Sequence, residues 1–546
     1  MKIETTLRYL TQVAILVVVP VWSSSAEPPQ LDFFFPAAVT RGETATVTAS
    51  GKLEPWPVKS WVNRPGLEME ATKDKGKFKV TVSADATGGL YLVRLHNAAG
   101  ASVLKPLVIG ELPQVLEKEP NNKQAEAQVL VESATVNGKL EKGGDVDQYS
   151  ISLKKGERLV AVVQANQVLG APMDTIIQLT DPRGFILEQN DDERLLDPMI
   201  VYSAPADGVY TVRVFAFPLT PNSTIGFAGG KNFVYRLTMT TGPFLDHAFA
   251  DRATVGGSPV VHFGGWNFAP ADQPVSLADV SILDPASPDL LLVTRPGAEG
   301  FITLPEVVSA ALVAQKSSSP KHPQEIPIPV VIGGEIESPG DQDVFRFQAT
   351  KGTAILFDVI SRTQGYSMDP LLQVRDAAGK VLGEVDDTNK KPDCQLAFVP
   401  PADGVYDLLV RDLHHHGGER YVYQVHARVR AADFQLKLAG GTYVLKPKVM
   451  LEIPLDVIRH HGFAEEISVT VEGLPAGVSA KAVKSLAKGT SAKKVKLVIQ
   501  GEAKAFSGAI KIVGTSADGK SKRLAHYLVP NLNWKRTDPW FTVATE

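Results

Sequence analysis

Carboxylates recur at matched places along this chain of 546 residues. The string Gly144-Asp145-Val146-Asp147 shares a Gly-Asp-x-Asp pattern with Gly340-Asp341-Gln342-Asp343. Acids two positions apart on an extended segment point to the same side, where their oxygens suit a hard cation such as Ca²⁺. The alternative is a pair of turn residues that hydrogen-bond their own backbone. The residue types leave both interpretations open.

Histidines also occur in clusters, at His414-His415-His416 and at His460-His461. Neighbouring residues on a strand point to opposite faces, so one such run converges poorly on a single metal ion. We expect polar loops at both places, with adventitious nickel or zinc binding as the alternative. The chain has no His-Glu-x-x-His helix, Gly-x-Ser-x-Gly elbow, phosphate-binding glycine-rich loop or nicotinamide fingerprint. These observations predict a protein that is not an enzyme and holds no organic cofactor.

Three further sets of residues have both a structural and a functional interpretation. The acidic pairs Asp191-Asp192 and Asp386-Asp387 are expected in solvated turns, with a secondary cation role as the alternative. Cys394 is the only cysteine, which excludes an intramolecular disulfide, and we expect it to be a half-buried apolar side chain. Five tryptophans are expected in domain cores, with stacking on sugars or peptides as the alternative: Trp56, Trp61, Trp266, Trp534 and Trp540.

A repeated pattern of strands must position these residues. The hexapeptide Pro205-Ala206-Asp207-Gly208-Val209-Tyr210 recurs letter for letter at 401–406, at the same interval as the two Gly-Asp-x-Asp strings. In the first copy Tyr149, Ile151 and Leu153 alternate with polar residues, which is typical of a strand with one buried face. Short strands between regular turn signals predict an all-β fold of tandem β-sandwich domains, immunoglobulin-like and jelly-roll.

The length of the chain indicates about three to five domains, because one hydrophobic core cannot serve so many residues. We expect seven segments: a signal peptide (1–26), an immunoglobulin-like sandwich called the first unit (27–112), the first repeat (113–242), a β-rich immunoglobulin-like middle unit (243–316), a linker (317–327), the second repeat (328–430), and an immunoglobulin-like sandwich with a tail, called the last unit (431–546).

The amino-terminal segment has the composition of an export signal. Lys2 and Arg8 precede an uncharged apolar run from Val13 to Trp22, and Ser24-Ser25-Ala26 offers small residues for cleavage. The run is short for a bilayer, so we expect cleavage, with an uncleaved anchor as the alternative. No later stretch is long and apolar enough for a membrane span, so the mature chain is expected in the periplasm, on the cell surface or outside the cell. The net charge of −4 lacks the excess of positive charge that is typical of nucleic-acid-binding proteins.

The first repeat resembles the bacterial pre-peptidase C-terminal domain, a β-sandwich appended to many secreted hydrolases. Three strings carry the resemblance: Glu117-Lys118-Glu119-Pro120-Asn121-Asn122, Gly144-Asp145-Val146-Asp147-Gln148-Tyr149, and Ala206-Asp207-Gly208-Val209-Tyr210-Thr211-Val212. The second repeat keeps the last two strings and lacks the Glu-x-Glu-Pro-Asn-Asn opening. The flanking immunoglobulin-like units are similar to those of large exported bacterial proteins.

The resemblance extends to the collagen-binding domains of secreted collagenases, in which the acidic opening and the Asp-x-Asp turn bind calcium. It implies five candidate calcium ligands here: Glu117, Glu119, Asn121, Asp145 and Asp147. Six to eight hard oxygens are what calcium takes in proteins, so the residue types are suitable. In the second repeat, which lacks the opening acids, a calcium site is not expected.

Repeated strand-rich modules, an export signal and the lack of a catalytic motif predict a non-catalytic exported binding or scaffold protein. Its partner would be an extracellular protein or a polysaccharide. The alternative is an accessory or processing factor for a separately encoded secreted hydrolase or peptidase, because pre-peptidase domains usually accompany a catalytic domain. A hydrolase without a recognisable motif is a third hypothesis.

Overall fold

The computed structural model describes residues 27–544, except 221–225, 252–259, 270–274, 277–280, 288–289, 306–309, 316–317 and 533. The predicted signal peptide at 1–26 lies outside the described residues. The chain is 54% strand and 3% helix, which confirms the all-β fold of tandem sandwiches. No helix among the described residues is long and apolar enough to cross a membrane.

The first unit consists of two sheets packed face to face. One sheet has the order β1 (Gln30–Phe35), β3 (Thr44–Lys52), β6 (Lys77–Val82), β5 (Leu67–Ala71). The other has the order β2 (Ala38–Thr40), β9 (Lys105–Gly110), β7 (Gly89–Asn97), β4 (Lys59–Val62), and β8 (Gly100–Ala101) also pairs with β7. Alternating residues such as Val47, Phe78 and Val80 fill the space between the sheets.

The two repeats have the same topology, with two five-stranded sheets each. In the first repeat the sheets are β10 (Gln114–Leu116), β12 (Ala134–Lys139), β19 (Val234–Thr240), β14 (Arg158–Gln164), β17 (Met199–Ser203), and β11 (Gln128–Leu130), β13 (Asp147–Leu153), β18 (Gly208–Pro218), β15 (Met173–Thr180), β16 (Ile186–Asn190). In the second they are β26 (Ala310–Val313), β28 (Val330–Glu335), β35 (Val422–Val429), β30 (Ile355–Ile360), β33 (Gln395–Phe398), and β27 (Gln324–Glu325), β29 (Asp343–Ala349), β34 (Gly404–Asp412), β31 (Pro370–Asp376), β32 (Val381–Val385).

The alternation expected from the sequence places the core of each repeat between its sheets. Tyr149, Ile151 and Leu153 of β13 are buried in the first core, and Phe345 and Phe347 of β29 are buried in the second. Each repeat opens with two short strands that run parallel to their neighbours, whereas the other pairings are antiparallel. These opening strands bring the segment before the sandwich against the start of β13 or β29.

Two strands lie across the boundaries expected from the sequence. Strand β26 falls within the expected middle unit but pairs with β28 of the second repeat. Strand β27 falls within the expected linker at 317–327 and pairs with β29. The second repeat therefore begins before residue 328, because its sheets pair with β26 and β27. The remaining boundaries stay predictions.

The middle and last units contain smaller sheets. The described strands of the middle unit form two sheets. One has the order β20 (Phe244–Asp251), β21 (Val260–Trp266), β22 (Val275–Ser276), and the other has the order β23 (Ser281–Leu283), β24 (Leu290–Val293), β25 (Ile302–Pro305). The last unit contains β36 (Asp433–Leu438), β38 (Leu451–His460), β42 (Lys494–Gly501), β40 (Val478–Ala480); β37 (Thr442–Leu445), β48 (Trp540–Val543), β43 (Phe506–Ala509); β41 (Val483–Ser485), β39 (Ile467–Glu472), β44 (Lys511–Ser516), β45 (Lys522–Leu524); and β46 (Tyr527–Leu528), β47 (Lys535–Arg536). The described helices are short: η1 (Gln124–Glu126), α1 (Asn166–Leu169), η2 (Arg362–Gln364) and η3 (Thr490–Ala492).

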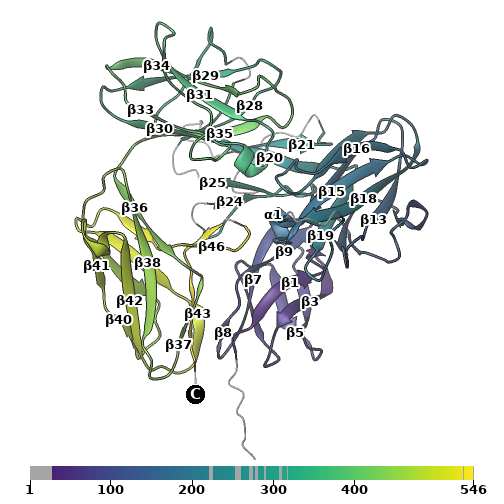
Figure 1. Cartoon of the computed structure of the whole chain (residues 1–546), viewed down its shortest axis with the longest axis horizontal. Helices are drawn as coiled ribbons and strands as arrows, with labels where there is room; N and C mark the ends of the chain where they lie inside the picture. Colours follow the sequence, from purple (N-terminus) through teal and green to yellow (C-terminus); the bar gives the residue numbers. More distant parts are fainter. Residues whose placement is uncertain are drawn as a thin grey trace, which may run out of the picture.

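The first and last units pack against each other, with the middle unit beside them (Figure 1). Strand β8 of the first unit lies along β37 and β48 of the last. The Trp61 and Trp540 rings meet edge to face with their centroids 5.6 Å apart. One continuous apolar cluster includes Leu90 and Leu92 of the first unit together with core residues of the last. The first and last units are therefore not structurally independent domains.

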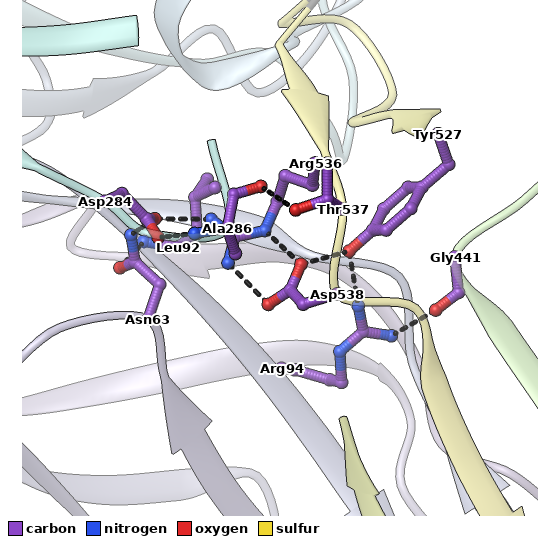
Figure 2. Close-up of polar contacts among 10 residues, drawn as sticks. All are labelled: Asn63, Leu92, Arg94, Asp284, Ala286, Gly441, Tyr527, Arg536, Thr537 and Asp538. Carbon is purple, nitrogen blue, oxygen red and sulfur yellow. Dashed lines mark hydrogen bonds and ion pairs between the residues drawn. The ribbon is translucent and has the colours of Figure 1, made fainter. Parts of the chain in front are cut away.

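A buried polar network joins three units at this contact (Figure 2). Arg536, 1% exposed, donates to Asp284 Oδ2 of the middle unit at 2.5 Å and to Asp538 at 2.6 and 2.8 Å. Asn63 Nδ2 of the first unit donates to the same Asp284 oxygen at 2.8 Å. Arg94, 2% exposed, donates to the Tyr527 hydroxyl at 3.2 Å. The network balances two guanidinium groups with two carboxylates, which is how buried charge is normally tolerated.

Candidate functional site

Three of the five predicted calcium ligands converge in the first repeat. Oxygens of Glu117, Glu119 and Asp147 all lie within 4.8 Å of one another. Glu117 directly follows β10, and Asp147 is the first residue of β13, so the parallel opening strands bring the acidic segment against the Gly-Asp-x-Asp turn. The backbone N–H of Lys139, at the end of β12, holds Glu117 Oε2 at 2.8 Å.

Asn121 belongs to the same cluster. It is fully buried, its Nδ2 donates to Glu117 Oε1 at 3.2 Å, and its backbone N–H donates to Glu119 Oε2 at 3.0 Å. The remaining side-chain oxygen of Asn121, Oδ1, is buried and accepts no hydrogen bond. An amide oxygen in this state is a suitable ligand for a hard cation.

Asp145 lies at the edge of the cluster rather than in the converging set. It is 2% exposed, and its Oδ2 accepts the backbone N–H of Glu141 at 2.7 Å. Burial is the main cause that raises the pKa of both Glu119 and Asp147, and the nearby Asp145 adds a smaller contribution. The structure thus brings Asp145 close to the other four residues without placing it among the three converging acids.

Three buried oxygens at this site have no hydrogen-bond donor: Oδ1 of Asn121, Oδ1 of Asp145 and Oδ1 of Asp147. Most buried polar atoms in folded proteins have a partner, so three such atoms in one cluster require an explanation. A bound cation supplies one, because it satisfies several oxygens at once. The donor set, which consists of carboxylate and amide oxygens, fits calcium.

Two tyrosines complete the site, and sequence reasoning assigned them no role there. The Tyr235 hydroxyl donates to Asp147 Oδ2, and it also bonds the Tyr149 hydroxyl at 2.6 Å. The single proton of the Tyr149 hydroxyl is shared between the Tyr235 oxygen and Glu117 Oε1, which lies 3.2 Å away. Both rings are fully buried in the sandwich core. The only local signal was the place of Tyr149 two residues after Asp147.

Asp147 is the electrostatic centre of the site. Burial, followed by its hydrogen bond to Glu117 and the charge of Glu117, raises the pKa of Asp147 to about 10. Burial also raises the pKa of Glu119. A proton on Asp147 therefore holds the acids together when no cation is bound, and a cation competes with that proton.

A family model described as the bacterial pre-peptidase C-terminal domain matches residues 145–216, which run from the Asp-x-Asp turn through the hexapeptide. These residues form a pre-peptidase C-terminal domain. The match begins at Asp145, so the opening segment with Glu117, Glu119 and Asn121 lies before it. The assignment of the second repeat to the same family stays a prediction, supported by its identical strand order.

A curated relative carries a similar segment. A probable subtilase-type serine protease of Deinococcus radiodurans is 36% identical over 101 residues, which are 18% of this chain and 14% of that protein. The chain thus spans about a seventh of the length of this relative.

Solved structures show more distant likenesses. The pre-peptidase C-terminal domain of a collagenase from Bacillus anthracis has 13% identity and a TM-score of 0.17, covering 23% of this chain and all of that domain. A Bacteroides ovatus protein of a mixed-linkage glucan utilization locus, solved with a heptasaccharide, has 12% identity and a TM-score of 0.14, covering 72% of each chain.

The position equivalent to this acidic cluster differs in the second repeat. Asp343 takes the place of Asp147 and accepts a hydrogen bond from the Tyr423 hydroxyl, as Asp147 does from Tyr235. Phe345 stands where the pre-peptidase C-terminal domain has Tyr149. Ser318 Oγ accepts the Val344 backbone N–H at 2.9 Å. Glutamates equivalent to those of the first opening are missing from the sequence before this turn.

The histidine triplet lies in a turn at the end of β34, as expected. The backbone N–H groups of His414 and His416 both donate to Asp412 Oδ2 at 2.9 Å, and His415 has a φ of 59°. Cys394 is more buried than expected, at 2% exposed, and burial raises its pKa to about 12. A thiol with such a pKa is protonated and is a poor nucleophile or ligand at neutral pH.

Proposed function

We propose that this chain is an exported, non-catalytic binding or scaffold protein whose pre-peptidase C-terminal domain binds calcium. The observation that carries the calcium site is the cluster of three buried, donor-free oxygens beside three converging acids. The binding role is supported by the tandem sandwiches and by the domain match at 145–216. The partner is an extracellular protein or a polysaccharide.

Bound calcium would fasten the opening segment to the sandwich. Glu117, Glu119 and Asn121 come from that segment, whereas Asp145 precedes β13 and Asp147 is its first residue. A cation held by both fixes the path of the chain where it leaves the first unit. An affinity in the range of about 10⁻⁴ to 10⁻³ M is sufficient for a calcium site outside a cell.

A calcium titration monitored by thermal melting tests the site. If the dissociation constant is about 10⁻⁴ M, about 10 mM calcium stabilises the first repeat by about 2.7 kcal/mol and raises its melting temperature. Asp145→Ala should abolish most of this response. The matched control is Asp341→Ala at the equivalent turn of the second repeat, which should retain it. An equal calcium response in wild type and Asp145→Ala would contradict the assignment.

Retention on extracellular materials tests the binding role. The mature chain should be retained by at least one of three supports, namely collagen, cell-wall glycan or whole-cell envelopes. Linked weak contacts from several domains should make the full chain bind more tightly than a single unit. If none of the three supports retains it in the presence of calcium, the binding role is wrong.

The second candidate function is an accessory or processing factor for a separate hydrolase. The similarity of one segment to a probable subtilase-type serine protease favours it, since pre-peptidase domains occur in such enzymes. A protease or hydrolase gene adjacent to the gene for this chain, together with copurification of the two products, would support this role over a free-standing scaffold. Incubation of the chain alone with peptide, ester and glycoside substrates should show no turnover.

A further inference from the structure

A cavity of about 160 Å³ lies where the five units of the chain meet. Every unit contributes to its lining, with Leu90 from the first unit, Gln164 from the first repeat, Phe301 from the middle unit, Gln364 from the second repeat and Trp534 from the last unit. None of the converging acids of the first repeat is in this lining, so the cavity is a separate place in the fold. Ligand sites occur preferentially at such domain junctions.

Hydrogen bonds between units hold the walls of this cavity in place. Asn531 Nδ2, in the segment of the last unit that carries Trp534, donates to the Gly170 carbonyl of the first repeat at 3.2 Å. Ser367 Oγ of the second repeat donates to Glu193 Oε1 of the first repeat at 3.2 Å, next to the lining. The cavity is therefore a property of the assembled chain, since no single unit forms it.

Trp534 differs from the other four tryptophans considered in the sequence. The rings of Trp56, Trp61 and Trp540 pack against other aromatic rings, and a guanidinium group lies over the ring of Trp266. Within the described part of the chain, the Trp534 ring has no aromatic or cationic neighbour of this kind, and its indole N–H donates no hydrogen bond. Trp534 packs against the apolar cluster that joins the first and last units and also lines the cavity, so it offers an aromatic surface and a donor to a ligand.

Neutral amide and hydroxyl groups make up most of the polar lining, and they belong to Gln164, Gln167, Thr303 and Gln364. The Gln364 side chain makes no hydrogen bond with any residue that the structure describes. Gln164 Oε1 accepts a hydrogen bond from Arg236, which leaves the amide Nε2 of Gln164 as a donor. Each amide offers two donors and one accepting oxygen, so these side chains can bond several hydroxyl groups of one ligand.

Only two of the described lining residues carry a charge, Arg194 and Asp197. Asp197 is 3% exposed and accepts three backbone N–H groups at the start of α1, at 2.8 to 3.2 Å, so the chain itself satisfies this carboxylate. Arg194 is half-buried, and its guanidinium makes no hydrogen bond or ion pair with the described residues. Because the two charges balance, the cavity suits an uncharged polar ligand, to whose oxygens Arg194 can donate.

The volume and the chemistry of the cavity together select the kind of ligand. Drug-sized ligands usually occupy about 300–1,000 Å³, so this smaller volume admits one small ring. Sugar hydroxyls both donate and accept hydrogen bonds, as amides do, and the C–H face of a sugar ring packs against an indole. An extended peptide would instead need a sheet edge or a long groove, so the cavity favours a sugar over a peptide.

We propose that this cavity binds one hexose-sized sugar residue, with Trp534 as the stacking surface and the glutamines as hydrogen-bonding partners. The inference rests on the binding role proposed above and narrows the partner from an extracellular protein or polysaccharide to a sugar. The ligand is either a free monosaccharide or the terminal residue of a glycan, and both present the same ring to the cavity.

Saturation-transfer NMR of the full mature chain tests this site. The probes are glucose, galactose, mannose and N-acetylglucosamine, each with its methyl glycoside, and glycerol is the control for a polyol without a ring. We expect at least one sugar to bind and glycerol not to bind. Tighter binding of the free sugar indicates a monosaccharide ligand, and equal or tighter binding of the glycoside indicates the end of a glycan. Either result supports the site.

Substitutions locate the binding in the cavity. Trp534→Ala should weaken sugar binding about tenfold because it removes the stacking surface, and Trp534→Phe should retain part of the affinity. Gln364→Ala removes an exposed side chain on which no described contact depends, and it should weaken binding about fivefold through the loss of one hydrogen bond. The matched control is Gln500→Ala, at an exposed position of β42 outside this lining, which should bind as the wild type does.

Three results would overturn the sugar site: no binding of any of the sugars, equal binding of glycerol, or wild-type affinity in both Trp534→Ala and Gln364→Ala. The wider binding role fails separately. A chain that binds no sugar but is retained by collagen would keep that role and lose only the sugar site.

Discussion

Asp147 and Asp343 show how the surroundings of one residue decide its chemistry. Both begin an equivalent strand, and both accept a tyrosine hydroxyl. Glu117 and its hydrogen bond add to burial around Asp147 and raise its pKa to about 10. Around Asp343, burial raises the pKa to about 7. The opening acids thus account for the difference between the two repeats.

This difference gives a pH-dependent stability in the absence of calcium. The folded state keeps a proton on Asp147 up to about pH 10, whereas the unfolded chain loses it near pH 4. Rising pH therefore destabilises the folded state across this interval, because the unfolded chain releases the proton and the folded state keeps it. Near pH 8, about one unit above the raised pKa of Asp343, that carboxyl is largely deprotonated in both states and contributes little, so Asp147 dominates. Denaturant unfolding with chelator should show the decline.

Two comparisons check this assignment. Asp147→Asn should flatten the pH dependence near pH 8, because asparagine is neutral throughout, like the protonated acid. Saturating calcium should also flatten it in the wild-type chain, since the cation replaces the proton. A slope that is the same in wild type and Asp147→Asn would show that another group titrates.

At the scale of the element, the repeated hexapeptide closes a turn rather than building a site. The Tyr210 hydroxyl donates to the Ala206 carbonyl at 2.9 Å, and the Tyr406 hydroxyl donates to the Ala402 carbonyl at 2.8 Å. The aspartate of each hexapeptide accepts a backbone N–H from the facing turn. The same letters recur because the same turn must be closed before β18 and before β34.

Loss of the turn aspartate should destabilise either repeat to a similar extent. Asp207 Oδ1 accepts the Lys155 N–H at 2.7 Å, and Asp403 Oδ1 accepts the Lys351 N–H at 2.6 Å. Asp207→Ala and Asp403→Ala should each cost about 1 kcal/mol of unfolding free energy, the usual value for one hydrogen bond. Asparagine at either position keeps the accepting oxygen and should retain most of the stability. Denaturant melts of the four variants compare these effects.

Local sequence patterns predicted the strands better than they predicted the contacts between strands. The alternation at Tyr149, Ile151 and Leu153 indicated a strand because one face of a sheet must be apolar. The acidic opening and the Asp-x-Asp turn came from a resemblance, and the structure brings Glu117, Glu119 and Asp147 together. The role of Tyr235 was not predictable, because its partner Asp147 is 88 residues away and no local sequence pattern links the two residues.

At the scale of the whole molecule, Arg536 links three units that local patterns treat as separate. Arg536→Ala leaves the half-buried Asp284 and Asp538 without their countercharge, which should cost about 3 kcal/mol. We expect the first and last units to separate, with an increase in the radius of gyration measured by small-angle X-ray scattering. The matched control is Arg523→Ala, because its ion pair with Asp433 is exposed and such pairs contribute little. A compact, equally stable Arg536→Ala variant would contradict this account.

The contact between β8, β37 and β48 has a consequence for how the protein is made. A ribosome releases the amino-terminal residues first, so Trp61 is synthesised long before its partner Trp540. Until β48 emerges, the side of the first unit that the last unit covers is open to solvent and to other nascent chains. This contact therefore cannot form before β48 has been synthesised, and a chain truncated ahead of β48 leaves the apolar side of the first unit exposed.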